Sequence, residues 1–331
     1  MISTENKPLV SVIIPCYNVS EFVEKAIHSI LKQSYSKLEI WIIDDASTDD
    51  TLAKIKGFND QRIKVVAFKE NTQKVGAVNI ILNQISGDYI CFQDADDWSD
   101  AKRIELQLEQ FMADGDLGIC FTNYRYIGRR IAEHGRIALD NQELRDEFLG
   151  FMQKNRNDID NTVCSTMMIS RAALQSTGGY HPYFAGRVAE DIHWIFRILK
   201  RFKGITVDKV LYHYTVREGS FTQLQRTGSN AKFAYSWQLL SKLIYKDIHD
   251  RIDLLEPFYE DELKIIELIA CEEALVENIR ELNNLKNSFE SSYSYRIGKM
   301  ILKPFQALKF IIIIFPKFFI NYFINNGKNY I

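Results

Sequence analysis

The sequence contains little of what marks several large protein classes. Its 331 residues include only five cysteines, widely spaced and without a Cys-x-x-Cys pair, which excludes a zinc knuckle and a thioredoxin-type redox motif. Six prolines and sixteen glycines are too few for a collagen-like or low-complexity chain. Neither sign of charge dominates, because 41 basic side chains stand against 43 acidic ones. The chain as a whole therefore lacks the basic surface of a nucleic-acid-binding protein, and we expect no nucleic-acid partner.

Targeting and nucleotide-binding signatures are also missing. The first residues show no basic segment followed by a long apolar core, and scattered single cysteines fit a reducing compartment, so we expect a cytoplasmic protein. No G-x-G-x-x-G follows the first apolar run, and no G-x-x-x-x-G-K-[ST] occurs, which disfavours a Rossmann-type dehydrogenase and a P-loop ATPase. A bound diphosphate would therefore need another source of positive charge, for which a divalent metal is the obvious candidate.

Short apolar runs alternate with helical patterns through the first third of the chain. This alternation predicts right-handed crossovers and an α/β fold with a mainly parallel sheet flanked by helices. The predicted strands cover residues 9–14 (ended by Pro15), 38–43, 63–68, 88–92 and 117–122, and the predicted helices cover 21–33, 76–85 and 102–112. Ligands of such sheets bind outside the carboxyl ends of the strands, so we look for the site at 15–18, 44–47 and 93–98.

The remaining two thirds are less regular. Residues 161–170 read as a strand, 190–202 as a helix, and 205–215 as one or two strands. The segment 231–290 has a helical pattern without turn residues except Pro257, and a long amphipathic helix over 268–289 would suit a homodimer through C-terminal helices.

The C-terminal stretch from Asn283 to Ile331 differs in charge, with seven lysines and arginines against Glu290 alone. It contains the apolar run 310–324, which is shorter than the roughly 20 residues of a spanning helix. Bulky apolar residues beside lysines favour a helix lying in a membrane interface, so we expect peripheral attachment to the inner face of the cell membrane. The alternative is a helix packed on the core or on a partner subunit.

Three acidic groups lie at the ends of predicted elements, two after strands and one at the start of the helix over 190–202. Asp94 and Asp96 point the same way if their strand continues, and such oxygen ligands suit Mg²⁺ or Mn²⁺ shared with phosphates, although a loop with a helix cap is the other reading. Asp45 could accept a hydrogen bond from a base or ribose, or cap the next helix. Asp191, beside Glu190, could act as a general base or be an ordinary N-terminal helix charge.

Taken together, these residues resemble the family 2 glycosyltransferases, inverting enzymes of the GT-A fold. The resemblance is close over about the first 100 residues and weaker later. The matching pieces are PLVSVIIPCYN, SILKQ, LEIWIIDDASTDDT, Asn71 with Ala77 and Asn79, SGDYICFQDADDW, GGYHPYFAGRVAEDIHWIFRI and LYHYTVREGS.

The resemblance implies a role for each matching position. Asp45 would contact a uracil-type base, the DxD motif Asp94-Ala95-Asp96 would hold the donor diphosphate with Asp96 as the main metal ligand, and Asp191 would deprotonate the acceptor hydroxyl. The remaining donor-pocket positions are Pro15, Tyr17 and Asn18, and the further candidates are Glu190, Asn79 and His213.

Three positions depart from the family pattern. Gln73 stands in place of a glycine, Val78 in place of an arginine that could face the donor, and Ala101 in place of a proline. The donor contact from the 71–79 segment is therefore in doubt, whereas the matching acids are all present.

The sequence thus predicts an inverting, metal-dependent glycosyltransferase. It would use a nucleotide-sugar donor, UDP-linked, and a glycan or lipid-linked acceptor in surface polysaccharide synthesis. We expect a catalytic domain over 1–225, with a nucleotide-binding half at 1–100 and an acceptor half at 101–225, followed by a helical extension at 226–290 and a membrane-associating tail at 291–331. A non-catalytic binding or scaffolding protein of the same fold is the alternative, and a nucleotidyltransferase would need a glycine-rich basic loop after the first strand.

Overall fold

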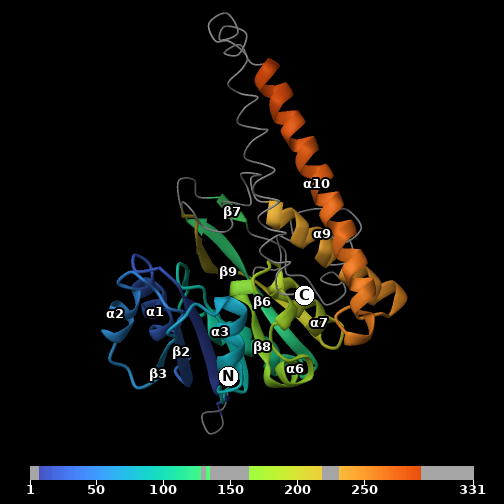
Figure 1. The fold of residues 1–331 in the computed structure, drawn as a ribbon. Helices are drawn as coiled ribbons and strands as arrows, with labels where there is room; N and C mark the ends of the chain where they lie inside the picture. Colours follow the sequence, from blue (N-terminus) through green and yellow to red (C-terminus); the bar gives the residue numbers. More distant parts are fainter. Residues whose placement is uncertain (1–6, 128–131, 135–163, 218–230, 292–331) are drawn as a thin grey trace, which may run out of the picture. The chain divides into compact units, whose positions relative to one another are not determined.

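The computed structural model describes residues 7–127, 132–134, 164–217 and 231–291 (Figure 1). The chain divides into two compact units, residues 1–275 and 276–331. The three-part division expected from the sequence stays a prediction, and the predicted membrane-associating tail lies outside the described residues apart from Ser291.

Nine strands of the described residues form one sheet in the order β3-β2-β1-β4-β8-β6-β9-β5, with β7 paired to β6. Strands β3, β2, β1 and β4 are parallel, as are β6 and β9, whereas β8, β5 and β7 run antiparallel to their neighbours. The predicted, mainly parallel sheet is therefore confirmed. The strands are β1 (Val10–Cys16), β2 (Leu38–Asp44), β3 (Ile63–Ala67), β4 (Tyr89–Phe92), β5 (Trp98–Ser99), β6 (Leu117–Ile127), β7 (Ala132–His134), β8 (Met168–Ser170) and β9 (Lys203–Thr215).

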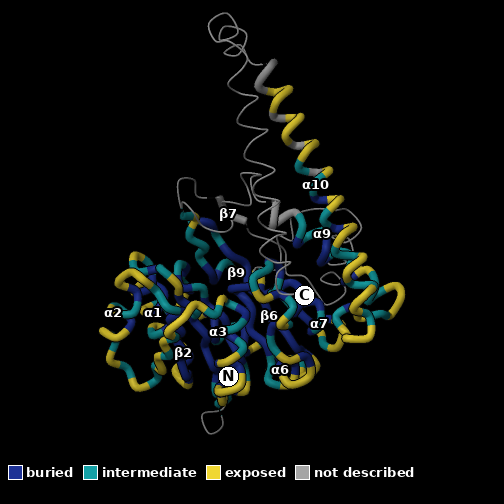
Figure 2. The backbone as a smooth tube through the Cα atoms, viewed as in Figure 1, coloured by how far each residue is buried: buried dark blue, intermediate teal, exposed yellow. Residues whose placement is uncertain are grey.

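Helices cover both faces of this sheet (Figure 1). Strand residues alternate between two apolar clusters, so that Val12 and Ile14 pack with α1, α2 and α4 while Ile13 packs with α3, α6 and α7. Figure 2 shows the strands buried between helices whose outer faces are exposed. The helices are α1 (Val23–Leu31), α2 (Thr51–Lys56), α3 (Gln73–Leu82), α4 (Arg103–Ala113), α6 (Arg171–Thr177), α7 (Glu190–Leu199), α9 (Ala231–Tyr245) and α10 (Glu260–Ser291).

Two local predictions need correction. Strand β1 does not end at Pro15 but continues to Cys16, because β4 pairs with β1 only as far as Ile13 and therefore needs no N–H from the proline. Of the segment predicted as a strand over 161–170, the structure describes residues 164–170, and within these a 3-10 turn at Cys164–Thr166 precedes the strand at Met168–Ser170. The run is apolar and buried, so its composition alone did not separate turn from strand.

The helical region after the sheet contributes to the core of the first unit. Leu240 and Ile244 of α9 and Ala270 of α10 are fully buried in the cluster that also contains Trp194 of α7. The long helix expected over 268–289 is confirmed within α10. None of the helices described here has the length and apolar character needed to cross a membrane.

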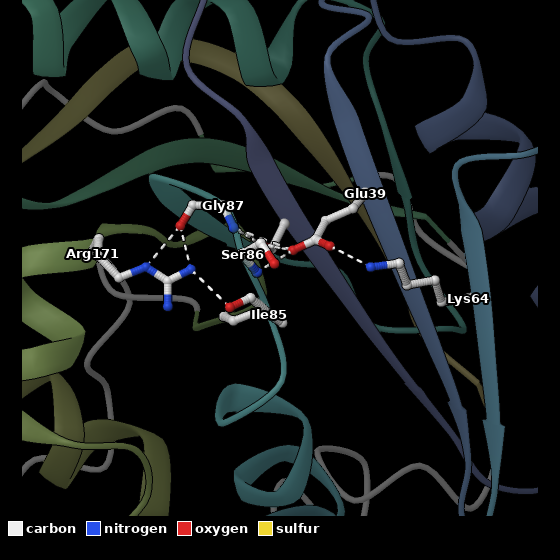
Figure 3. Close-up of polar contacts among 7 residues, drawn as sticks. Glu39, Lys64, Ile85, Ser86, Gly87 and Arg171 are labelled. Atoms are coloured by element: carbon white, nitrogen blue, oxygen red, sulfur yellow. Dashed lines mark hydrogen bonds and ion pairs between the residues drawn. The ribbon is translucent and has the colours of Figure 1, made fainter.

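A polar network fixes the amino ends of β1 and β2 (Figure 3). The Glu39 carboxylate accepts hydrogen bonds from the Ser11 hydroxyl at 2.5 Å, the Ser86 N–H at 2.6 Å and the Lys64 ammonium at 2.8 Å. Burial alone would raise the pKa of Glu39, but the hydrogen bonds from Lys64, Ser11 and Ser86 lower it to about 2. This carboxylate is therefore ionised and satisfied.

The same network holds the turn that enters β4. The Gly87 N–H donates to Ser11 Oγ at 2.9 Å, and Arg171 donates to the carbonyl oxygens of Gly87 and Ile85 (Figure 3). A side chain at position 87 would place its Cβ 2.4 Å from Ser11 Oγ, so only glycine allows this approach. The turn sets the register of β4, and β4 leads directly into the acidic segment at 94–97.

Candidate active site

The loops after β1 and β2 are bonded to each other. The Asn18 N–H donates to Ser47 Oγ at 3.1 Å, and the Thr48 N–H donates to Asn18 Oδ1 at 2.8 Å. Asn18 and Ala46 both adopt positive φ, at 50° and 61°, and asparagine tolerates this conformation better than most residues. Asn18 thus shapes the floor of the predicted nucleotide pocket, whereas Tyr17 beside it has 49% of its surface exposed.

Asp45 connects the second loop to helix α3. Its Oδ1 accepts hydrogen bonds from the Thr72 N–H at 2.8 Å and the Thr72 hydroxyl at 2.9 Å. Thr72 is the residue before the first turn of α3, so this buried carboxylate fixes where the helix begins. The next residue, Gln73, has a positive φ of 62°, and its N–H donates to Asn71 Oδ1. The start of α3 is therefore held in place from two sides.

Residues of β9 hold the segment that follows β4. The Tyr212 hydroxyl donates to Asp97 Oδ2 at 2.8 Å and accepts from the Asp94 N–H at 3.2 Å. The Thr215 N–H donates to Asp97 Oδ1 at 2.7 Å. Burial, followed by the charges of Asp96 and Asp94, holds the pKa of Asp97 well above its usual range. Asp97 therefore anchors the turn and leaves Asp94 and Asp96 at its tip.

A buried arginine supports this turn from below. Arg103 of α4 is fully buried and donates to the carbonyl oxygens of Phe92 at 2.8 Å and Ser165 at 2.9 Å. It also donates to Ser99 Oγ at 2.9 Å. Its guanidinium thus joins the end of β4 to the turn before β8 and makes the acidic segment part of a rigid framework.

Glu190 and Asp191 open helix α7. The preceding residue, Ala189, has a positive φ of 74°, which turns the chain sharply into the helix. Asp191 Oδ1 accepts a hydrogen bond from the Ile192 N–H at 2.7 Å. Burial and the neighbouring Asp191 raise the pKa of Glu190 to about 7, against the opposing charge of Lys74.

The structure brings the DxD motif and the α7 carboxylates into one electrostatic cluster. Burial raises the pKa of Asp94; the charge of Lys74 opposes this rise, while Asp96 and Asp191 add to it. Asp94 is therefore close enough to Asp96, Glu190 and Asp191 for their charges to interact, although the two segments lie about 100 positions apart in the sequence.

Two cations enter this cluster. Lys74 Nζ of α3 lies 3.8 Å from Asp94 Oδ1, and Arg217 Nε lies 2.7 Å from Asp96 Oδ2. Burial by itself would lower the pKa of Lys74, but Asp94, Tyr180, Glu190 and Asp191 raise it well above its usual range. Each carboxylate of the DxD motif thus has its own counter-ion.

Other candidate positions lie in different surroundings. Asn79 uses its side-chain amide on the backbone of Tyr180, donating to its carbonyl at 2.7 Å and accepting from its N–H at 2.9 Å. A Cβ at Gly179 would lie 2.3 Å from Asn79 Oδ1, so Asn79 fits closely against the turn that leads towards α7. His213 stacks on Trp98 with ring centroids 3.5 Å apart, and the charges it faces are Arg125, Asp100 and Lys25. Pro15 lies near the end of β1, and Ala95 is buried in the turn after β4.

Sequence reasoning missed several residues that shape the site. Lys74 and Arg103 belong to no motif used above, whereas Tyr212 and Arg217 lie in the matching piece LYHYTVREGS but were given no role there. For Arg103 a signal was available, because Arg103 and Gln107 are polar residues four apart on the apolar face of a helix that also contains Ile104 and Leu108. Lys74 had no such local signal, since a lysine in the first turn of a helix is usually solvated.

The acidic tip fits a divalent ion that is shared with a ligand. No three His, Cys, Asp or Glu side chains among the described residues are grouped so as to hold a metal ion by themselves. Asp94 and Asp96 nevertheless supply two carboxylates whose like charges repel, and Mg²⁺ is commonly bound by one or two carboxylates plus substrate phosphates. Mn²⁺ accepts the same oxygen ligands.

Comparison with protein families gives a match over half of the chain. The model of the family described as "Glycosyl transferase family 2" matches residues 11–178. A Bacillus subtilis protein named as a teichuronic acid biosynthesis glycosyltransferase, TuaG, is 33% identical over 227 residues, which cover 66% of this chain and 83% of TuaG. The Escherichia coli protein WfgD, named as a UDP-Glc:alpha-D-GlcNAc-diphosphoundecaprenol beta-1,3-glucosyltransferase, is 36% identical over 36% of this chain and 47% of its own length.

Solved structures share the fold at low sequence identity. Residues 1-349 of S. aureus TarS, crystallised with UDP, align with a TM-score of 0.54 and 17% identity over 91% of this chain and 78% of that one. The mannosyltransferase PcManGT from Pyrobaculum calidifontis, in complex with GDP-Man and Mn2+, aligns with a TM-score of 0.53 and 19% identity, covering 90% of this chain and 84% of the other. These likenesses support the GT-A-like architecture.

Proposed function

The chain belongs to glycosyl transferase family 2, and from this membership we propose that it transfers a sugar from a UDP-linked donor to a hydroxyl group of a lipid-linked glycan, with inversion at the anomeric carbon. The observation that carries the proposal is the cluster of Asp94, Asp96, Glu190 and Asp191 at the carboxyl end of the sheet. An acidic cluster of this kind can both bind the diphosphate through a cation and accept a proton.

The donor would occupy the loops after β1 and β2. Tyr17 offers an exposed ring for a base, and the Asn18–Ser47 contact fixes the loop beneath it. Asp45 already accepts two hydrogen bonds through Oδ1, so a base imide N–H would have to use its other oxygen. UDP is favoured because WfgD is named for a UDP-Glc donor and TarS was crystallised with UDP, whereas the GDP-Man complex of PcManGT makes GDP-mannose the natural second donor to test.

The reaction needs only one displacement. The oxygen of the acceptor hydroxyl attacks the anomeric carbon while Asp191 takes the proton of that hydroxyl. The bond from the anomeric carbon to the donor phosphate oxygen breaks, and its electron pair leaves on UDP. A Mg²⁺ or Mn²⁺ ion bound by Asp94 and Asp96 would neutralise charge on the departing diphosphate. Attack from the face opposite the leaving group inverts the configuration, so no covalent enzyme intermediate forms.

The acceptor is proposed from the relatives and from the C-terminal sequence. TuaG is named for teichuronic acid biosynthesis and WfgD for a diphosphoundecaprenol-linked acceptor. The seven lysines and arginines after Asn283, together with the apolar run at 310–324, are suited to anionic lipid at the inner face of the membrane. A glycan on a lipid carrier would then be presented where the tail attaches.

A donor and acceptor screen with one variant tests the proposal. The full chain is incubated with UDP-sugars and GDP-mannose, Mn²⁺ and a short-chain lipid diphosphate glycan, and the product anomer is identified by NMR. We expect transfer with inversion, and we expect Asp96→Ala to abolish it while leaving the thermal unfolding temperature within a few degrees of wild type. Asp116→Ala, at a side chain 81% exposed, is the matched control and should stay active. Transfer by Asp96→Ala at the wild-type rate, or retention of configuration, would contradict the proposal.

A further inference from the structure

The two carboxylates of the DxD motif are already paired with cations. Lys74 Nζ lies 3.8 Å from Asp94 Oδ1, and the Lys74 side chain is 36% exposed. Arg217 Nε lies 2.7 Å from Asp96 Oδ2 with a side chain 32% exposed. A divalent ion that approached these carboxylates alone would meet two positive charges, and it would have to displace at least one of them.

Lys74 is positioned for this contact by the anchored start of α3. The two hydrogen bonds from Thr72 to Asp45 fix the first turn of the helix, and Lys74 projects from that turn. Val78, the position at which the family usually has an arginine, lies one helical turn later and is fully buried in the core. Positions 74 and 78 are one helical turn apart, and of the two only position 74 brings a charge to the acidic cluster.

The field around Lys74 is strongly negative. Asp94, Tyr180, Glu190 and Asp191 together raise its pKa well above the usual range, so the ammonium keeps its proton throughout the neutral range. A partly exposed lysine on a flexible stem can change partners without unfolding the helix. A diphosphate brings more negative charge than one carboxylate and is the stronger partner for such a cation.

We propose that Lys74 is an exchangeable counter-ion: it neutralises Asp94 in the free protein and transfers to the donor diphosphate on binding, which releases Asp94 for the metal. The inference rests on the proposed function and extends it, because metal and nucleotide then bind cooperatively. The nucleotide removes the cation that opposes the metal, and by linkage the metal strengthens nucleotide binding by the same factor.

Mn²⁺ binding without nucleotide tests the exchange directly. The free Mn²⁺ signal is measured by electron paramagnetic resonance as the full-length wild type, Lys74→Met and Lys74→Arg are titrated. Lys74→Met should bind Mn²⁺ about three- to tenfold more tightly than wild type, because a partly exposed charge a few ångströms away changes binding by that order. Lys74→Arg should behave as wild type. Lys56→Met, which removes an exposed lysine of α2, is the matched control and should change nothing.

The opposite change is expected for the nucleotide. Without metal, Lys74→Met should bind UDP about three- to tenfold more weakly than wild type, as measured by calorimetry, and the cooperativity between Mn²⁺ and UDP should shrink. A merely structural lysine would lower the unfolding temperature and leave both affinities unchanged, and that result would overturn the inference. Weaker Mn²⁺ binding by Lys74→Met would overturn it as well. A wild type that binds no UDP would contradict the proposed donor, and the Mn²⁺ titration would still decide the role of Lys74.

Discussion

Carboxylates held inside the protein lie at both ends of the sheet, buried at the amino end and half-buried at the carboxyl end, and their surroundings are opposite. At the amino end, Glu39 accepts hydrogen bonds from Ser11, Ser86 and Lys64, which lower its pKa to about 2 despite burial. At the carboxyl end, burial and Asp191 raise the pKa of Glu190 to about 7, and the pKa of Asp94 is raised as well.

The difference shows that the carboxylate at the amino end of the sheet stabilises the fold, whereas those at the carboxyl end are available for binding and proton transfer. Four donors are directed at the Glu39 carboxylate, namely the Ser11 hydroxyl, the Lys64 ammonium and the N–H groups of Ser86 and Gly87, so its charge stabilises the fold. At the carboxyl end several carboxylates share two cations, so the folded protein retains unneutralised negative charge there. Such a site gains free energy when a cation or a proton arrives, which is what a binding and proton-accepting site requires.

The largest effect should come from removing the proposed base. Asp191→Asn keeps the size of the side chain but cannot take the acceptor proton, so we expect turnover to fall by about 10²–10⁴-fold. UDP affinity, measured separately by calorimetry, should change little. Asp191 would not be the base if turnover stayed near the wild-type rate, or if a loss of donor binding explained the whole defect.

At the other end of the sheet, Glu39→Gln should affect stability. The variant loses the charged acceptor of four hydrogen bonds in a side chain that is 7% exposed, so we expect the free energy of unfolding at pH 7 to fall by about 2–3 kcal/mol. Urea unfolding followed by circular dichroism measures this. Lys64→Met, at a side chain 47% exposed, should cost no more than about 1 kcal/mol.

The pH dependence of the Glu39→Gln effect has a definite sign. The folded pKa of about 2 lies below the ordinary value of 4.5, so the stabilisation is present above pH 4.5 and is lost as the pH falls towards 2. The difference between wild type and Glu39→Gln should therefore shrink below pH 4.5. A difference that stayed constant from pH 7 to pH 3 would mean that the charge of Glu39 is not what stabilises the turn before β4.

Glu190→Gln should give the smallest effect, and in the opposite direction. The folded pKa of about 7 lies above the ordinary 4.5, so the stabilisation from protonated Glu190 is present below pH 4.5 and is lost as the pH rises through 7. At pH 8 the glutamine variant should be more stable than wild type by about 1–2 kcal/mol, discounted for partial exposure. Near pH 4 the two should be equal, and Glu109→Gln, at an exposed position of α4, should match wild type throughout. If Glu190→Gln were less stable than wild type at pH 8, the ionised Glu190 carboxylate would stabilise the fold, and the prediction would be wrong.

The sequence predicted those parts of the fold that depend on local pattern. Strands β1 to β4 and helices α1, α3 and α4 follow from apolar periodicity and turn residues, and the carboxyl ends of the strands were the place predicted for a ligand. The place of β8 could not be predicted, because a three-residue strand that inserts antiparallel between β4 and β6 is selected by long-range pairing. The same holds for the turn at Cys164–Thr166.

For the site, the sequence predicted acids but not their counter-ions. Asp94, Asp96 and Asp191 stand in recognisable motifs, and the structure brings them into one cluster. Lys74 and Arg217 reach that cluster only because α3 and the end of β9 converge on it, which no spacing along the chain expresses. Asn79 was expected near the donor, yet its amide is committed to the backbone of Tyr180.

The hydrogen bond from Tyr212 to the acidic turn at 94–97 affects how the newly made chain can fold. Tyr212 lies 115 positions after Asp97, whose carboxylate it holds, and β5 pairs with β9. A ribosome releases the acidic turn long before it releases the strand that shapes it. A nascent chain that has reached residue 200 would carry both aspartates of the DxD motif and the α7 carboxylates but not their scaffold. The acidic turn should therefore reach its final form only after Thr215 has left the exit tunnel.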